Sequence, residues 1–220
     1  MQETKNFVKK LKFFNTLSDD DIDIVANMSK PVKYVKNSIL FYENDTSDKL
    51  YFLVSGLLKV YKIDKYDNEI FLYHIYEDSL VSELTSIQMN TIYCFSNAEF
   101  LEDSIILEVN FHQFKTQFLE KNILNDEFID AILLKTQQLH CVVNRELVFD
   151  ATAKVAFMLH DDLKTFNKLK RQDVSFMLHI QPETLSRVLK KLKRSGIIEI
   201  EQSNILIKDA IALQNIYKGL

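Results

Sequence analysis

The chain has 220 residues, 47% of them apolar, and a formal net charge of -4 at pH 7. This length allows two domains, and the apolar content is sufficient for a hydrophobic core in each. Cys94 and Cys141 are too far apart for a Cys-x-x-Cys motif, and two thiols are too few for a four-cysteine iron–sulfur cluster. No apolar run reaches the roughly 18 residues of a membrane span, and the N-terminus lacks a signal-peptide core. We therefore expect a cytoplasmic protein with no metal site.

The first half of the chain predicts short helices followed by many short strands. Within residues 7–30, Ser18 precedes an acidic run and predicts a helix N-cap. Across residues 34–109 the apolar pattern has a period of two. Turns are expected where two small polar residues meet, namely at Asn44-Asp45, Asp67-Asn68 and Ser96-Asn97. Short antiparallel strands at this spacing predict a small β-barrel or β-roll.

After a short predicted helix at residues 111–121, residues 122–149 contain neither Pro nor Gly and predict one long helix. Its apolar stripe consists of Phe128, Ile132, Leu139, Val143 and Leu147. A long helix between two domains has few neighbours in its own chain. We predict that this stripe packs against a second copy, forming a homodimer interface; the alternative is packing against the β-roll alone.

A new helix begins after Asp150, which is well placed to cap it. The absence of a Gly/Ser/Pro stretch indicates a hinge at this point instead of a flexible linker. The predicted organisation is a β-roll domain with N-terminal helices at residues 1–121, a dimerisation helix with its hinge at 122–150, and a C-terminal domain at 151–220.

The positive charge of the chain is concentrated near its C-terminus. Residues 163–194 hold nine Lys and Arg against two acidic residues, a local balance of +7 that leaves -11 elsewhere. An ordinary solvated helix face is the alternative interpretation. The cations coincide, however, with a pattern of two short helices, a tight turn near His179 and a following hairpin. A winged helix-turn-helix, whose second helix enters the major groove of DNA, is therefore predicted.

Three segments resemble the family of the cAMP receptor protein and the fumarate-nitrate reduction regulator (CRP/FNR). They are LYFLVSGLLKVYK with Gly56, DSLVSEL with Glu83, and RQDVSFMLHIQPETLSRVLKKLKRSGII. The resemblance covers nearly the whole chain and implies an α+β fold: an N-terminal β-roll, a long dimerisation helix and a C-terminal winged helix-turn-helix. It also implies a transcriptional regulator whose partners are double-stranded DNA, a second copy of itself and RNA polymerase. No enzymatic motif is present, so no catalytic residues are expected.

The second helix is similar to the family's recognition helix through its E-x-x-S-R pattern. By that likeness Glu183 would accept from a cytosine amino group, Arg187 would fork onto a guanine, and Ser186 would place or read a neighbouring thymine. This type of helix implies inverted repeats resembling TTGA-N6-TCAA. The predicted phosphate contacts are Arg171, Gln172, Gln181 and Lys190. Two residues depart from the pattern: His179 stands where the turn often has Gly, and Pro182 replaces an Arg.

The β-roll departs from the cAMP-binding members in its ligand set. Ser82 replaces a Gly beside Glu83, residues 91–96 contain no cation, and Leu139 replaces a hydroxyl residue. A cyclic phosphate buried without an Arg would have no compensating charge. We therefore expect a signal other than cAMP, or none.

No cofactor is required by these residues, but haem-based sensing of a gas or of redox state is the alternative function. Some members of the family bind haem in the roll, and the candidate ligands in this chain are His74 and His140. A redox switch is a further alternative, at Cys94 if its thiol is exposed or at Cys141 on the long helix, although no cation adjoins either cysteine in sequence. The sequence determines neither the effector nor whether the protein activates or represses.

Overall fold

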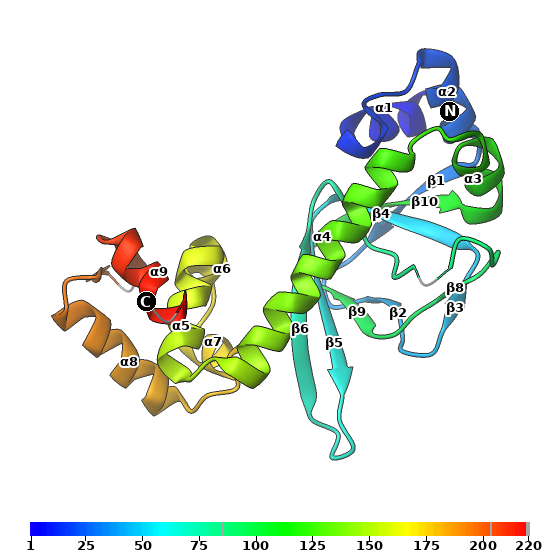
Figure 1. The fold of residues 1–220 in the computed structure, drawn as a ribbon. Helices are drawn as coiled ribbons and strands as arrows, with labels where there is room; N and C mark the ends of the chain where they lie inside the picture. The colour runs from blue at the N-terminus through cyan, green and yellow to red at the C-terminus, as the bar shows by residue number, and fades with distance from the viewer. Residues whose placement is uncertain (85, 203, 219–220) are drawn as a thin grey trace. The chain divides into compact units, whose positions relative to one another are not determined.

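The computed structural model describes residues 1–84, 86–202 and 204–218 of the chain. These residues form two compact units, Met1–Leu139 and His140–Leu220. The division falls within the long helix, between the predicted domain limits at 121 and 150. The elements of each unit are labelled in Figure 1.

The first unit begins with two helices, α1 (Gln2–Lys10) and α2 (Asp19–Asn27), separated by a 3-10 turn at Lys12–Phe14. The Ser18 side chain accepts a hydrogen bond of 3.2 Å from the Asp21 amide, which confirms the predicted N-cap. Three acidic residues in the first turn of α2 also favour its positive N-terminal end.

The strands that follow form a β-roll, as predicted. One sheet has the order β1 (Ser29–Tyr34), β10 (Ser104–Asn110), β4 (Lys49–Ser55), β7 (Ser79–Leu80). The other has the order β2 (Ile39–Phe41), β9 (Asn97–Phe100), β5 (Leu57–Ile63), β6 (Glu69–Tyr76). A short pair, β3 (Thr46–Ser47) and β8 (Ile92–Tyr93), completes the roll, and every pairing is antiparallel.

Two of the three predicted turns are confirmed by their backbone. Asn44 and Asp67 have positive φ angles of 73° and 62°. The third prediction was wrong, because Asn97 begins strand β9 and is buried. Its side chain accepts from the Glu43 amide at 3.1 Å and donates to the Tyr61 carbonyl at 3.3 Å. Bonds to neighbouring strands therefore satisfy this amide, and they replace the local bonds that would make a turn.

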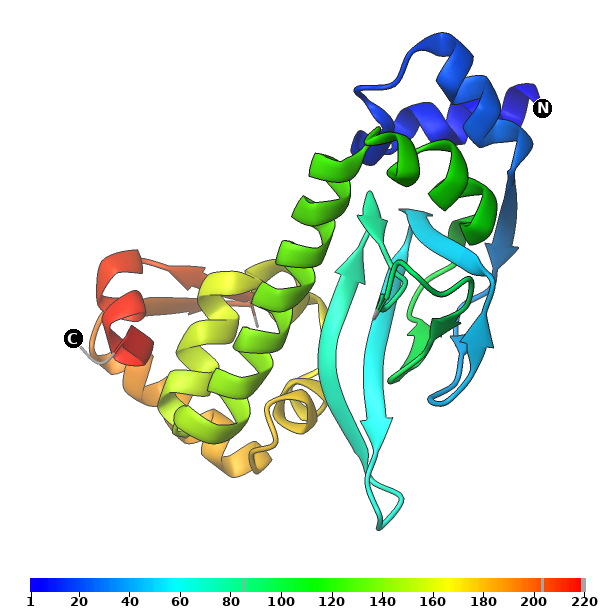
Figure 2. The same cartoon turned by 45° about the vertical axis from the view of Figure 1, so that its right-hand side comes forward.

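Helix α3 (Phe111–Gln117) and the 3-10 turn Leu119–Lys121 match the predicted short helix, and α4 (Asn125–Val143) follows. In both views α4 runs beside β6 (Figures 1 and 2), and Gln138 Nε2 donates to the His74 carbonyl at 3.4 Å. A π-helical turn, Asn144–Val148, continues the chain beyond α4.

The predicted stripe on α4 requires one correction. Phe128 is only 5% exposed, lies in the apolar core of the first unit, and has its ring 6.5 Å from that of Phe114. It is therefore unavailable to a partner. Ile129, one position further on, is 53% exposed. The other predicted members are exposed: Ile132, Leu139, Val143 and Leu147.

The second unit is a helical domain with a β-hairpin. Its elements are α5 (Ala151–Asp161), α6 (Leu163–Lys168), α7 (Arg171–Met177), α8 (Pro182–Arg194), β11 (Ile198–Glu201), β12 (Asn204–Ile207) and α9 (Ala210–Lys218). Asp150 caps α5 as predicted, accepting from the Ala153 amide at 2.8 Å. Figure 2 shows the hairpin between α8 and α9, which makes the domain a winged helix-turn-helix.

Two glycines with positive φ allow a matched test of packing against backbone strain. A Cβ at Gly56 (φ 104°) would overlap the side chain of Ser104, whereas a Cβ at Gly196 (φ 74°) would meet nothing within 4 Å. We expect Gly56→Ala to lower the free energy of unfolding by about 3 kcal/mol and Gly196→Ala by about 1 kcal/mol. Urea unfolding followed by circular dichroism measures both, and equal losses would contradict the packing argument.

Candidate nucleic-acid interface and the cavity of the roll

Helix α8 is strongly amphipathic, and its apolar side is part of the domain core. Leu185, Val188, Leu189 and Leu192 are each at most 6% exposed. They recur at helical spacing and fix which way α8 faces. Pro182 occupies the first turn, where its missing N–H has no intrahelical partner to lose.

The opposite side of α8 brings the predicted base-reading residues together. A shallow surface depression is lined by Glu183, Ser186, Arg187, Lys190, Lys191, Arg194 and Ser195. Glu183 lies in the first turn, where a carboxylate is favoured, and the cations occupy the last turns. Within the part of the chain that the structure describes, neither Arg187 nor Lys190 has a carboxylate within salt-bridge distance. Both can therefore bind an external anion without breaking an internal pair.

The four predicted phosphate contacts differ in their exposure to solvent. Gln172, Gln181 and Lys190 are exposed. Arg171 is half-buried, with its guanidinium carbon 4.7 Å from the centre of the Phe166 ring and Nη1 donating to the Phe166 carbonyl at 3.3 Å. Burial lowers the pKa of Arg171, although a guanidinium keeps its charge at neutral pH. The Phe166 contact holds this cation in one orientation.

The turn between α7 and α8 is built around His179. This residue has a φ of 51°, a left-handed conformation that His adopts more readily than most non-glycine residues. Its Nδ1 lies 2.8 Å from Oε2 of Glu146, a residue of the π-helical turn after α4. Sequence reasoning missed Glu146, because the contact joins residues 33 positions apart in a segment with no recognisable motif.

The hairpin β11–β12, which is the wing of the domain, is held by a side chain of α6. Asn167 of α6 donates to the Ile205 carbonyl at 2.9 Å and accepts from the Ile205 amide at 2.8 Å. Asn167 thus pairs with β12 as a neighbouring strand would. This bond was also absent from the sequence predictions.

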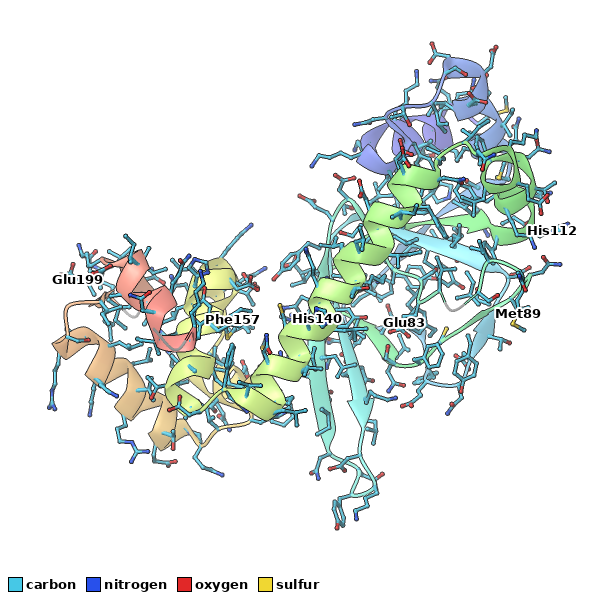
Figure 3. The ribbon with its side chains drawn as sticks, in the orientation of Figure 1. Glu83, Met89, His112, His140, Phe157 and Glu199 are labelled. Carbon is cyan, nitrogen blue, oxygen red and sulfur yellow. The ribbon has the colours of Figure 1, made fainter. Side chains whose placement is uncertain are left out.

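The first unit contains a cavity of about 470 Å³ between the roll and α4. Its lining is mostly apolar and consists of Lys62, Leu72, Tyr73, Leu80, Ser82, Glu83, Leu84, Phe95, Ser96, Ile132, Lys135, Thr136 and Leu139. Figure 3 labels Glu83 on the roll beside α4. Among the described residues that line this cavity, Lys62 and Lys135 are the cations.

Glu83 is engaged by the roll itself. Its carboxylate accepts from the Phe95 amide at 2.8 Å, from Ser96 Oγ at 2.7 Å and from the Tyr73 hydroxyl at 3.3 Å. Burial, with Glu83 nearby, raises the pKa of Tyr73 far above its usual value. The phenol therefore remains a proton donor to Glu83.

Lys135 reaches the cavity from α4. Its ammonium donates to the Val81 carbonyl at 3.0 Å and lies 5.9 Å from the centre of the Tyr73 ring. Burial lowers the pKa of Lys135 to about 8, and the nearby Glu83 carboxylate only partly opposes this. Lys62, the other cation of the lining, is already paired with Glu43 at 2.7 Å.

The two predicted haem ligands are not among the residues that line this cavity. His74 is 7% exposed, has its ring 4.8 Å from that of Phe71, and is not among the lining residues. His140, labelled on α4 in Figure 3, is exposed and also outside the lining.

The Cys94 thiol, a candidate for redox chemistry only if exposed, is buried at 3% exposure. Burial raises the pKa of this thiol to about 12, so it stays protonated and unreactive at neutral pH. Burial also raises the pKa of the Cys141 thiol.

Comparison with known proteins agrees with this architecture. Residues 31–121 match the cyclic nucleotide-binding domain and residues 154–216 match the Crp-like helix-turn-helix domain. The anaerobic regulatory protein of Bacillus subtilis (strain 168) is 22% identical over 202 residues, which cover 87% of this chain and 84% of that protein. Electron transport regulator A of Shewanella oneidensis is 24% identical over 213 residues, covering 86% and 78% respectively. The chain belongs to the CRP/FNR family of transcriptional regulators.

Solved structures share the fold of this CRP/FNR-family chain. A mutant of CooA from Carboxydothermus hydrogenoformans superposes with a TM-score of 0.73 at 19% identity, covering 94% of each chain. FixK2 from Bradyrhizobium japonicum gives a TM-score of 0.64 at 17% identity, covering 86% of this chain and 96% of that one. Among the described helices, none has both the length and the apolarity to cross a membrane.

The low pKa of Lys135 predicts a specific dependence of stability on pH. Folded Lys135 releases its proton near pH 8, whereas in the unfolded chain its pKa returns towards 10.5. Between these values the unfolded state binds more protons, so the free energy of unfolding rises with pH. Relative to the Lys135→Met variant, the parent should gain stability from about pH 8 to pH 10 and show no change below about pH 7. Urea unfolding of both proteins over this range measures the difference, and a constant difference would contradict the assignment.

Proposed function

We propose that this CRP/FNR-family regulator binds, as a homodimer, an inverted repeat resembling TTGA-N6-TCAA, and that its roll responds to a signal other than cAMP. The observation that carries the proposal is the exposed face of α8, where Glu183, Ser186 and Arg187 lie together above a row of cations. A carboxylate suits the amino group of cytosine, and a guanidinium suits O6 and N7 of guanine. Such a regulator acts in the cytoplasm, and no catalytic role is proposed.

The homodimer is supported by the apolar side chains that α4 leaves exposed. Ile129, Ile132, Leu139 and Val143 are between 40% and 53% exposed. Their spacing alternates three and four residues, as in a two-helix seam, with Thr136 filling the remaining position. A second α4 would bury this seam and supply the second recognition helix that an inverted repeat requires.

A signal other than cAMP is supported by the chemistry of the cavity. Glu83 already accepts three hydrogen bonds from the roll, and Lys62 is already paired. One ammonium of lowered pKa, Lys135, is a weak counter-charge for a buried phosphate. Haem sensing is not favoured, because neither His74 nor His140 lines the cavity. We also propose that the DNA-bound dimer contacts RNA polymerase, as a transcriptional regulator of this family would.

The assignment of Arg187 predicts a loss of both affinity and selectivity. In a gel shift on a TTGA-N6-TCAA duplex, Arg187→Ala should cost about 1–3 kcal/mol per half-site and relax discrimination at the guanine. Arg187 is exposed and has no ion-pair partner among the described residues, so the fold should be unchanged.

Lys190→Ala is the matched control for this experiment. A phosphate contact carries no base information, so this variant should weaken binding to all sequences alike and reduce the salt dependence of affinity. If Arg187→Ala behaved in the same way as Lys190→Ala, Arg187 would be a phosphate contact and the base-reading role would be wrong.

The seam on α4 predicts a change of oligomeric state. Ile129→Glu places a charge in the seam and should shift the protein to a monomer, with loss of binding to the inverted repeat. Gln137→Glu, which introduces the same charge at an exposed polar position of α4, should leave the dimer intact. Sedimentation equilibrium distinguishes the two, and a dimeric Ile129→Glu protein would rule out this interface.

A further inference from the structure

The segment between α4 and α5 contains a cluster of charged side chains that no base-reading or effector role uses. Glu146 is half-buried in the π-helical turn, and Arg145 beside it is 8% exposed. Glu146 Oε1 accepts from Arg145 Nε at 2.7 Å, while Oε2 lies 2.8 Å from His179 Nδ1 and 3.8 Å from Lys154 Nζ. We call Glu146, His179, Arg145 and Lys154 the hinge clamp.

The hinge clamp joins three elements of the second unit. Glu146 and Arg145 follow α4 directly, Lys154 lies in the first turn of α5, and His179 forms the turn before α8. An apolar contact lies next to it, where the Phe149 ring packs 5.5 Å from Phe157 and 6.0 Å from Tyr217. Phe149 thus ties the chain to α5 and α9, whereas Glu146 contacts His179 in the turn of the helix-turn-helix.

Two features indicate that the Glu146–His179 contact is more than incidental. A non-glycine residue at a φ of 51° is strained relative to Gly, which takes this conformation freely. The imidazole therefore contacts Glu146 from a position where Gly would cost the backbone less. In addition, the pKa of Glu146 lies below its usual value. Burial raises this pKa, but the hydrogen bonds from Arg145 and His179 outweigh burial, so the carboxylate stays charged.

We propose that the contact between Glu146 and His179 positions α8 relative to the end of α4, and so sets the half-site spacing that the dimer accepts. This inference rests on the proposed homodimer and its inverted repeat. Each base pair added between half-sites moves them apart by about 3.4 Å and rotates them by roughly 35° about the DNA axis. A dimer whose recognition helices are held rigidly rejects such a change, whereas one with a loose hinge accommodates it.

His179→Gly separates this role from a purely structural one. Glycine suits the left-handed backbone, so the variant should melt at the same temperature as the parent or above it, although it loses the clamp. Asn37→Gly is the matched control, since Asn37 has a similar φ of 65° at an exposed turn of the roll. Glu146→Ala and the double variant with His179→Gly complete the set.

The experiment measures the affinity of each protein for TTGA…TCAA duplexes with spacers of five, six and seven base pairs. The parent and Asn37→Gly should prefer the six-base-pair spacer by about tenfold or more. His179→Gly and Glu146→Ala should each reduce this preference to about threefold or less, and the double variant should lose no more than either single one. Selectivity for the guanine and the salt dependence of binding should not change.

The outcomes distinguish the clamp from the function on which it rests. A parent that binds none of the three repeats overturns the proposed function and the clamp with it. A parent with a spacing preference that His179→Gly retains in full overturns the clamp alone. A preference lost only together with a lower melting temperature, in both single variants, also overturns it, because the side chains would then act through stability.

Discussion

The packing of α8 against its own domain is the constraint on which the rest of the structure depends. Leu185, Val188, Leu189 and Leu192 fill the core of the second unit, and each buried leucine or valine contributes about 1.5–3 kcal/mol of hydrophobic stabilisation. Rotating the helix by even one position would bury Ser186 or Arg187 and expose this apolar row. Hydrophobic burial therefore fixes the face that carries the proposed base-reading residues, and it leaves Glu183, Ser186 and Arg187 exposed.

The polar groups of the cavity in the roll are largely bound by the protein itself. Strand β4 pairs with β10 and β7, strand β5 pairs with β6 and β9, and the cavity lies between the roll and α4. Within it, Glu83 binds the protein's own amide and hydroxyl groups. Lys135 is held by a backbone carbonyl. A cavity with these interactions is apolar and weakly basic, which differs from a site built to neutralise a phosphate.

The local patterns along the chain predicted much of this structure. The period-two segments became strands, and Ser18 and Asp150 became helix caps. These predictions succeeded because each depends on contacts within a few residues. The failures share the opposite property. Asn97 is drawn into a strand by bonds to β5 and to the segment after β2, and Phe128 packs in the core beside the Phe114 ring of α3.

The sequence by itself determined that this chain has a sensor-like roll, a long helix and a winged helix-turn-helix with Glu183, Ser186 and Arg187 on one face. Periodicity and charge are properties of neighbouring residues, so they are visible before folding. Only the tertiary structure decided that Ile129 replaces Phe128 on the exposed side of α4, that Cys94 is buried, and that Glu146 meets His179. Each of these depends on which distant side chains share a buried volume, and no local pattern specifies that.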